Sequence, residues 1–413
     1  MLNIAIIGYV WPEPNSSAAG QNMLSIIKSC LEAGFRVTFY TPATDSEHKA
    51  DLDTLGVESH TISINCSSFN QTIAALQPDV VIFDRYMTEE QFSWRVKESC
   101  PKALRLLNTE DLHSLRQARH EAVKSKGCAL HVDLHTELAQ REIAAILRCD
   151  ITLIISQYEM DLLQQHYRVP KSQLHYHPLC VEQQEAVTPS YAERAHFVHI
   201  GNFRHAPNWD AVLQLKQHIW PAIRAKLPQA ELHIYGAYPP KKATQLHNAK
   251  QGFLVKGWAE SAKEVMMNAR VLLAPIRFGA GIKGKVLDAM RCGTPSITTW
   301  VGAEGIVHEH NAWPGTVCSA VLTDPSNIED YVSNAVNLYT NEHTWEAASA
   351  RCHTVLQQYR EQYSVNALTE KLVTTANNID KHRKKHFLQA MLWHQTLNAS
   401  KYMSQWIEAK NRL

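Results

Sequence analysis

Residues Pro275–Ile306 read PIRFGAGIKGKVLDAMRCGTPSITTWVGAEGI, and they carry the clearest structural signal in the 413-residue sequence. The apolar run VLLAP, which begins at Val271, predicts a buried strand that ends in a glycine-bearing loop. Gly293, followed by Thr-Pro, ends the helix that comes next, and SITT then predicts a second parallel strand. The inward face of that helix is marked by Val286, Leu287, Ala289 and Met290.

Two glycine-bearing loops of this kind place free backbone N–H groups and a positive helix terminus at one edge of a sheet, where anions bind well. Lys283 and Lys285 add positive charge beside Gly281, and two cations suit a diphosphate better than a single carboxylate. Asp288, about one turn further along the helix, is placed to accept hydrogen bonds from a ribose diol. The stretch therefore predicts a site for the diphosphate and ribose of a nucleotide.

This stretch resembles the C-terminal half of the GT-B glycosyltransferases, in particular the retaining family 4 type (glycosyl transferases group 1). The shared pattern is G-x-G-x-K-x-K-[VL]-[ED]-A-M, then G-x-P and G-x-E-G. The resemblance implies that the diphosphate of a sugar nucleotide lies on these loops and that Asp288 holds the ribose. Many members have a glutamate eight residues before this carboxylate, where the chain has Ala280. Glu304 either replaces that glutamate as a contact to the donor or caps the next helix. The resemblance therefore does not identify the donor sugar.

The composition indicates a globular enzyme of two domains with no nucleic-acid partner. The 41 Lys and Arg residues balance 40 Asp and Glu residues, so no excess positive charge is available to neutralise a phosphate backbone. Nine scattered cysteines without a C-x-x-C pair indicate a reducing compartment. The sequence starts without a basic, apolar leader and has no apolar run of roughly 18 residues, so we expect a cytoplasmic protein.

Strands and helices alternate along the chain, which predicts an α/β fold with parallel sheets. The apolar run Asn3–Gly8 predicts a central strand, followed by a polar loop and a helix, and the same pattern starts again at His196. Together with the resemblance, this implies two Rossmann-like domains that face each other across a cleft (GT-B). We expect an acceptor domain over residues 1–190, a donor domain over 191–370, and a helical tail over 371–413 that crosses back to the first domain.

Each domain has one further phosphate-binding candidate in its first strand-to-helix loop. The resemblance implies that Gly20 approaches the donor phosphates from the first domain. In the second domain Gly201 ends a strand, and Arg204 is a phosphate-binding candidate with which His205 competes. We expect Asn208 to cap the helix that follows.

The charged segment TEDLHSLRQAR, which starts at Thr109 after a predicted buried strand, is the candidate for the reacting end of the site. It resembles the family segment that brings a histidine to the reacting sugar, which implies a place for His113 near the anomeric centre. Asp111 either orients His113 or caps a helix. His113, Asp111 and Lys283 form the predicted catalytic set.

Other residues receive structural roles. A helix is predicted over 131–148, with His131 and His135 one turn apart, but without a third ligand these histidines indicate a solvent-facing surface and not a metal site. Trp258 is expected to pack in a core, and the alternative is a shelf on which the nucleotide base lies. We predict no metal site.

The predicted function is transfer of a sugar from a nucleotide-diphosphate sugar to a glycan, lipid-linked or other hydroxyl acceptor. The resemblance implies retention of configuration. No D-x-D pair follows a predicted strand, which favours a reaction without metal or other cofactor. Two alternatives remain: a sugar-nucleotide epimerase or hydrolase of the same fold, and a catalytically silent sugar-nucleotide-binding protein, which Ala280 keeps open.

The tail after Asp380 combines a basic cluster, KHRKKH, with aromatic and aliphatic residues. The resemblance implies helices that brace the first domain. The alternative is a helix on a membrane surface, which would place the protein in peripheral contact with the cytoplasmic face of the inner membrane. The sequence does not indicate an oligomeric state.

Overall fold

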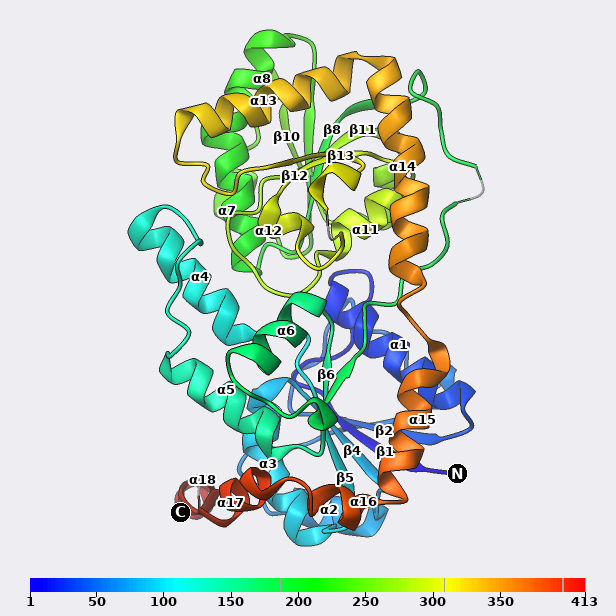
Figure 1. The fold of residues 1–413 in the computed structure, drawn as a ribbon, viewed down its shortest axis with the longest axis vertical. Helices are drawn as coiled ribbons and strands as arrows, with labels where there is room; N and C mark the ends of the chain where they lie inside the picture. The colour runs from blue at the N-terminus through cyan, green and yellow to red at the C-terminus, as the bar shows by residue number, and fades with distance from the viewer. Residues whose placement is uncertain (186, 308, 396, 413) are drawn as a thin grey trace.

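The computed structural model describes every residue of the chain except Ala186, His308, Thr396 and Leu413. It consists of two α/β lobes stacked along the long axis of the molecule, each built on one parallel sheet (Figure 1). The C-terminal helices return from the second lobe to the first. The predicted fold, two Rossmann-like domains with a tail that crosses back, is therefore confirmed.

The first lobe contains a seven-stranded sheet in the order β3-β2-β1-β4-β5-β6-β7. The central strand β1 has no exposed surface from Ile4 to Ile7, because helices cover both faces of the sheet. The strands are β1 (Asn3–Ile7), β2 (Arg36–Thr41), β3 (Glu58–Thr61), β4 (Val80–Asp84), β5 (Leu104–Asn108), β6 (Ile151–Ile154) and β7 (Leu174–Tyr176). The helices are α1 (Ala18–Glu32), α2 (Ser68–Leu76), α3 (Arg85–Ser99), α4 (His113–Lys126), α5 (Glu137–Arg148) and α6 (Gln157–Gln165).

The second lobe contains a six-stranded sheet in the order β10-β9-β8-β11-β12-β13. The strands are β8 (Ala195–Ile200), β9 (Leu232–Tyr235), β10 (Phe253–Gly257), β11 (Ala269–Ala274), β12 (Ser296–Thr299) and β13 (Gly315–Cys318). The helices are α7 (Ala206–Gln214), α8 (Trp220–Lys226), α9 (Lys241–Thr244), α10 (Ala262–Asn268), α11 (Gly284–Arg291), α12 (Trp300–Ala303), α13 (Pro325–Thr340) and α14 (Glu342–Arg360). Across the described residues, no helix combines the length and the apolar character needed to cross a membrane.

The sequence signal of residues 275–306 corresponds to α11 and β12, which follow β11. The four apolar residues expected on the inward face of α11 are buried in the second-lobe core. The helix ends at Arg291, and Gly293 adopts a positive φ of 64°, which explains why a glycine follows the helix.

The strand order reverses next to the first strand of each sheet, since β1 lies between β2 and β4, and β8 lies between β9 and β11. Ligands of open α/β sheets usually bind outside the carboxyl ends of the strands at such points. The fold therefore places the loops after β1 and β4 in one lobe, and after β8 and β11 in the other, where a shared ligand could bind.

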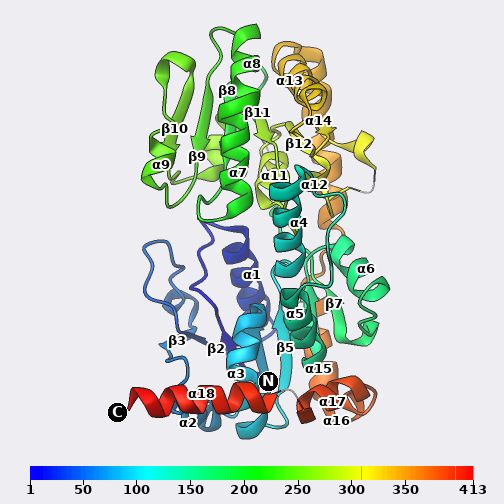
Figure 2. The same ribbon diagram turned by 90° about the vertical axis from the view of Figure 1, so that its left-hand side faces the viewer.

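The chain returns to the first lobe after α14. There α15 (Val365–Ala376) packs against α1, and α16 (Ile379–Arg383) follows. α17 (Phe387–Gln395) packs against α5, and α18 (Leu397–Asn411) packs against α3 at the far end of the lobe (Figure 2). The expectation that the tail braces the first domain is thus confirmed.

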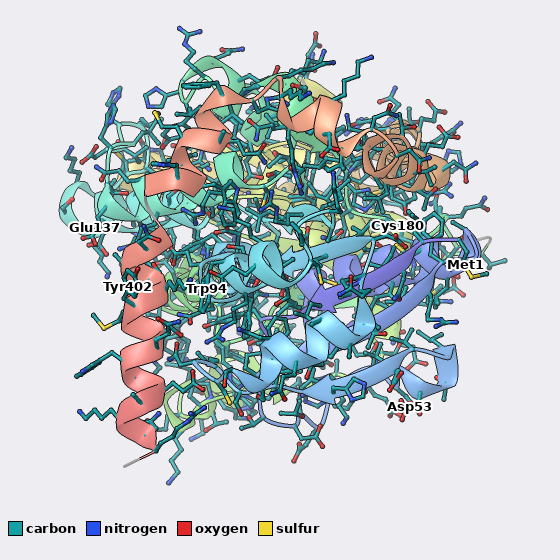
Figure 3. The ribbon with its side chains drawn as sticks, turned by 90° about the horizontal axis from the view of Figure 1, so that it is seen from below. Met1, Asp53, Trp94, Glu137, Cys180 and Tyr402 are labelled. Carbon is teal, nitrogen blue, oxygen red and sulfur yellow. The ribbon has the colours of Figure 1, made fainter. Side chains whose placement is uncertain are left out.

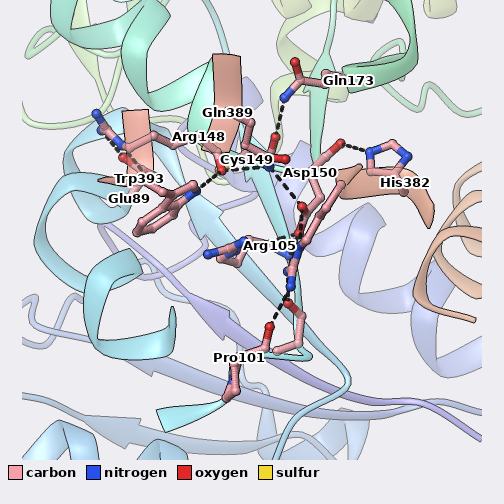
Figure 4. Close-up of polar contacts among 12 residues, drawn as sticks. Glu89, Pro101, Arg105, Arg148, Cys149, Asp150, Gln173, His382, Gln389 and Trp393 are labelled. Atoms are coloured by element: carbon pink, nitrogen blue, oxygen red, sulfur yellow. Dashed lines mark hydrogen bonds and ion pairs between the residues drawn. The ribbon is translucent and has the colours of Figure 1, made fainter. Parts of the chain in front are cut away.

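A buried carboxylate fastens the tail to the first lobe (Figure 4). Asp150 has no exposed surface and accepts hydrogen bonds from Arg383 of α16, at 2.8 and 2.9 Å, and from Gln389 of α17, at 3.0 Å. The guanidinium of Arg105 lies 3.7 Å away. Burial raises the pKa of Asp150, but Arg383 and Arg105 outweigh it and hold the pKa below its ordinary value. An ionised carboxylate therefore joins three segments of the chain.

Two predicted helix starts are wrong. The helix predicted over 131–148 begins only at Glu137, so His131 and His135 lie in the preceding loop and share no helix face. Helix α7 begins before Asn208, with His205 as its N-cap, because a proline fits the first helical turn where its missing N–H is not needed. Asn208 thus lies inside the helix, and its side chain is available for another contact.

Replacing Asp150 with alanine should lower the free energy of unfolding by about 3–5 kcal/mol, because Arg105 would be left buried without its partner. Chemical denaturation followed by circular dichroism measures this change. The difference between parent and variant should shrink below about pH 4, where protonation removes the charge of Asp150 in the parent as well.

The matched control is Asp380→Ala, since Asp380 forms an exposed pair with Lys102 and its loss should change little. If Asp150→Ala unfolds like this control, the carboxylate does not fasten the tail.

Candidate functional site

A cleft of about 750 Å³ lies between the carboxyl edges of the two sheets. This volume is within the range of small-molecule sites. The first lobe contributes the loop after β1 and the segment after β5, and the second lobe contributes the loops after β8, β9, β10 and β11. The cleft therefore contains most of the predicted site residues.

The ammonium group of Lys285 lies on the second-lobe wall of the cleft. Its Nζ donates to Asn208 Oδ1 at 2.7 Å. A Cβ atom on Gly201 would lie 2.7 Å from that Nζ, so the glycine makes the approach possible. Burial lowers the pKa of Lys285 to about 7. A partly buried cation bonded to a neutral amide favours an anionic ligand.

Lys283 lies at the start of α11 on the same wall. Its Nζ donates to the carbonyl oxygen of Gly281 at 2.8 Å. Burial lowers the pKa of Lys283, while Glu304 acts in the opposite direction. The first residues of α11 also line the cleft, and the amides of a first helical turn have no partner within the helix. Two cations and a helix N-terminus thus meet at one wall.

Asp288 and Arg204 also line the cleft. Burial raises the pKa of Asp288 to about 6, although the neighbouring Arg291 acts to lower it. The guanidinium of Arg204 lies 3.6 Å from the centre of the Tyr238 ring, in a cation–π contact. Both residues are therefore within the same cavity as the lysines, as their predicted roles require.

The first lobe presents Asp111, His113 and Arg116 to the cleft. Burial raises the pKa of Asp111, but Arg116, which donates to its carboxylate, and His113 outweigh this and hold the pKa well below its ordinary value. His113 Nε2 lies 3.5 Å from Asp111 Oδ1, and burial lowers the pKa of His113 to about 3. The site thus contains a neutral imidazole beside an ionised carboxylate. A carboxylate whose pKa is held this low accepts a proton poorly, so the arrangement suits Asp111 better to orienting His113 than to acting as a base.

Glu304 is held by the first lobe and does not line the cleft. Arg119 of α4 donates to its two carboxylate oxygens, at 2.8 and 2.7 Å, and to the carbonyl oxygen of Gly279 at 2.7 Å. Both charged side chains are almost fully buried. In this structure Glu304 therefore joins the lobes.

Two predicted glycines have their amides occupied. Gly281 N donates to the buried Glu159 Oε1 at 2.9 Å, which is a second contact between the lobes. Gly20 N donates to the N-cap Ser17 Oγ at 3.0 Å, and a Cβ on Gly20 would lie 2.3 Å from the carbonyl oxygen of Glu13. In this structure the amides of both glycines therefore have partners within the protein, and their contact with phosphate stays a prediction.

Aromatic residues at one end of the cleft were missed or misassigned from the sequence. Trp258 is 40% exposed, lines the cleft and stacks on His48 with 4.8 Å between ring centroids, so the predicted core packing is wrong. Tyr238 Oη donates to Glu13 Oε1 at 2.9 Å across the lobes. A usable signal existed, because Trp258 directly follows the carboxyl end of β10, where ligands collect.

Glu110 is a further cleft residue that the sequence did not single out. It has a positive φ of 62° and accepts hydrogen bonds from Asn108, at 2.7 Å, and Asn22, at 3.2 Å. Burial and the nearby Asp84 raise its pKa to about 8, which favours the protonated carboxyl group at neutral pH. Neither Glu110 nor any other described residue belongs to a group of three His, Cys, Asp or Glu side chains that could hold a metal ion.

Residues 194–341 match the protein family described as Glycosyl transferases group 1. The matched region is the second lobe from β8 to α13, and it includes both lysines and Asp288. A comparison with curated proteins found no matching sequence. The family match supports glycosyltransferase activity.

Solved structures share the fold over nearly the whole chain. TarM from S. aureus, in complex with fondaparinux, alpha-GlcNAc-glycerol and UDP, has a TM-score of 0.65 at 10% identity, over 91% of this chain and 100% of TarM. Sucrose-phosphate synthase from Thermosynechococcus elongatus has a TM-score of 0.62 at 13% identity, over 92% and 99%. HepE from Anabaena, in complex with UDP and glucose, has a TM-score of 0.61 at 12% identity, over 92% and 100%. The chain therefore has the GT-B fold.

The lowered pKa of Lys285 predicts a pH-dependent affinity for pyrophosphate. The ammonium form binds an anion, so the advantage of the parent over Lys285→Met should be largest at pH 6 and should fall by up to about tenfold per unit as the pH rises above about 7. Isothermal titration calorimetry at several pH values gives the ratio of the two affinities.

The ionisation of pyrophosphate itself affects both proteins equally and cancels in this ratio. A ratio that stays constant from pH 6 to pH 9 would contradict the assignment of Lys285 to the anion site.

Proposed function

We propose that this chain is a glycosyltransferase that moves a sugar from a nucleotide-diphosphate sugar, held by the second lobe, to a hydroxyl acceptor that enters from the first lobe. The observation that carries the proposal is the pair of ammonium groups, on Lys283 and Lys285, at the start of α11 on the cleft wall. The match of this lobe to the group 1 glycosyl transferases supports it.

The lysines are proposed to stabilise the departing diphosphate. Negative charge develops on the leaving group during transfer, and fixed cations and amides in a narrow cleft stabilise such charge effectively. Lys283 and Lys285 supply the cations, and the first turn of α11 supplies the amides. With these groups in place, we propose a reaction that needs no metal ion.

His113 is proposed to hydrogen-bond a hydroxyl group of the reacting sugar. Its neutral ring has one donor and one acceptor nitrogen. Asp111, itself held by Arg116, fixes the orientation of the ring. We propose retention of configuration, with the leaving phosphate taking the acceptor proton on the same face of the sugar. The resemblance to the retaining family supports that step.

The donor is proposed to be a uridine diphosphate sugar, since the TarM and HepE complexes both contain UDP. Asp288 would hold the ribose, and the exposed face of Trp258 would support the base. Many members of the family have a glutamate at the position of Ala280. We propose that Glu110, on the cleft wall, contacts the sugar in its place.

Two alternatives can be separated by the products. An epimerase or hydrolase of this fold would convert the donor without any acceptor, whereas a silent binding protein would bind UDP and never turn it over. The acceptor is proposed to be a glycan or a lipid-linked glycan.

Replacing Lys283 or Lys285 with alanine should weaken UDP binding by about tenfold or more, because each variant removes a charge-assisted hydrogen bond worth about 1.5–3 kcal/mol. Isothermal titration calorimetry gives the dissociation constants. Lys226→Ala is the matched control, because Lys226 is exposed on α8 outside the cleft. Lysine variants that bind UDP like this control would refute the donor site.

Replacing His113 with alanine should reduce kcat by about 100-fold while UDP affinity stays nearly constant, because the hydrogen bond is made to the sugar during transfer. Steady-state kinetics and calorimetry measure the two effects separately. His135→Ala, in the loop before α5, is the control and should retain both activity and affinity. Loss of UDP affinity without a change in kcat would show that His113 has been placed at the wrong end of the ligand.

A further inference from the structure

The two last helices of the tail expose apolar side chains to solvent. We call this group the tail face. The exposed fraction is 82% for Phe387, 63% for Tyr402 and 59% for Trp406. The tail face consists of Phe387, Leu388 and Met391 on α17, and of Tyr402, Met403 and Trp406 on α18.

The polarity of α18 is reversed relative to an ordinary surface helix. Polar residues on its inward side attach it to the first lobe: Lys401 pairs with Glu98, Ser404 accepts a hydrogen bond from Arg95 at 3.2 Å, and Glu408 accepts a backbone N–H at 3.0 Å. Their spacing of three and four residues places them on one side of the helix. The orientation of α18 is therefore set by polar contacts, which leave the opposite side to the solvent.

The outward side of α18 carries its largest apolar side chains. Tyr402, Met403 and Trp406 recur at helical spacing and are all more than half exposed. Figure 3, which views the molecule from below, shows α17 and α18 on the near side of the first lobe, with Tyr402 on α18. Large apolar side chains exposed on two neighbouring helices of a folded protein often mark a place of interaction.

Lysines lie beside the tail face. Lys384 and Lys385 are exposed three and two residues before Phe387, and Lys410 Nζ lies 5.3 Å from the centre of the Trp406 ring. Residues 380–412 contain seven Lys and Arg against two Asp and Glu, whereas the whole chain carries a formal charge of +1. Arg383, Lys401 and Arg412 pair with Asp150, Glu98 and Glu408. The exposed lysines of this segment are Lys381, Lys384, Lys385 and Lys410.

We propose that the tail face binds the surface of a bilayer that contains anionic lipids. The apolar side chains enter the boundary between headgroups and acyl chains, and the lysines contact the headgroup phosphates. Aromatic and aliphatic residues bordered by lysine are typical of helices that lie in this interface. In this orientation the first lobe stands between the bilayer and the second lobe (Figure 1).

A second copy of the chain is the main competing occupant. A symmetric dimer through the tail face would bring the same patch of each copy together. The lysines of one copy would then face those of the other, and like charges oppose association. An anionic surface complements the same lysines, which is why we favour the bilayer.

Cosedimentation of the full-length protein with vesicles tests the proposal. The parent should pellet with phosphatidylcholine vesicles that contain phosphatidylglycerol and should stay in solution with phosphatidylcholine alone. The double variants Lys384→Glu/Lys385→Glu and Met403→Ser/Trp406→Ser should each reduce binding by about tenfold or more. Their melting temperatures should match the parent, because the altered side chains are exposed.

Two controls change similar residues elsewhere. Lys226→Glu/Lys250→Glu changes the net charge by the same amount, at exposed positions of the second lobe. Val187→Ser removes an exposed apolar side chain from the segment that connects β7 to β8. Both control proteins should bind anionic vesicles like the parent.

Equal pelleting with both kinds of vesicle, or equal binding by the parent and the tail variants, would overturn the proposal. The tail face would instead bind a second copy if the parent does not bind vesicles and is dimeric by light scattering, while the tail variants are monomeric. If the parent is monomeric and does not bind vesicles, the tail face would be left for a protein partner, and the proposal would equally be overturned. The assay contains no nucleotide, so its result is independent of the proposed glycosyl transfer.

Discussion

A partly buried positive charge without a full counter-charge is the constraint on which the site depends. Lys285 has the neutral side-chain oxygen of Asn208 as its hydrogen-bond partner, and Lys283 has a backbone carbonyl oxygen. Burial of a cation is unfavourable, and the lowered pKa of Lys285 expresses that cost. A diphosphate in the cleft would offset it. The sheet topology of the two lobes holds the ammonium groups of Lys283 and Lys285 at the edge of the cleft.

The contacts between the lobes hold the lysine loop in place. Arg119 of the first lobe bonds Glu304 and the carbonyl oxygen of Gly279, and Glu159 accepts the amide of Gly281. Gly279 and Gly281 belong to the loop that leads into α11, so this loop is bonded to the opposite lobe on both sides of Ala280. Closure of the lobes and the conformation of the lysine loop are therefore coupled through hydrogen bonds.

The sequence predicted β11, α11 and β12 because those signals are local: an apolar run, a helical spacing of apolar residues and a glycine stop. It could not predict the contact between Lys285 and Asn208, which are 77 residues apart and meet only through sheet topology. The same holds for Trp258 and His48, whose stacking joins the two lobes. The late start of α5 at Glu137 was missed although Thr136 is a favourable N-cap, because apolar periodicity outweighed the capping signal in the prediction. Fold and lysine loop were thus accessible from local patterns, whereas the partners of each site residue were not.

A crystal structure of the protein with UDP would test the central claim most directly. The account predicts diphosphate oxygens within about 3 Å of Nζ of both Lys283 and Lys285, with the ribose near Asp288. A diphosphate bound elsewhere in the cleft, or lysine side chains that turn away from it, would contradict the account.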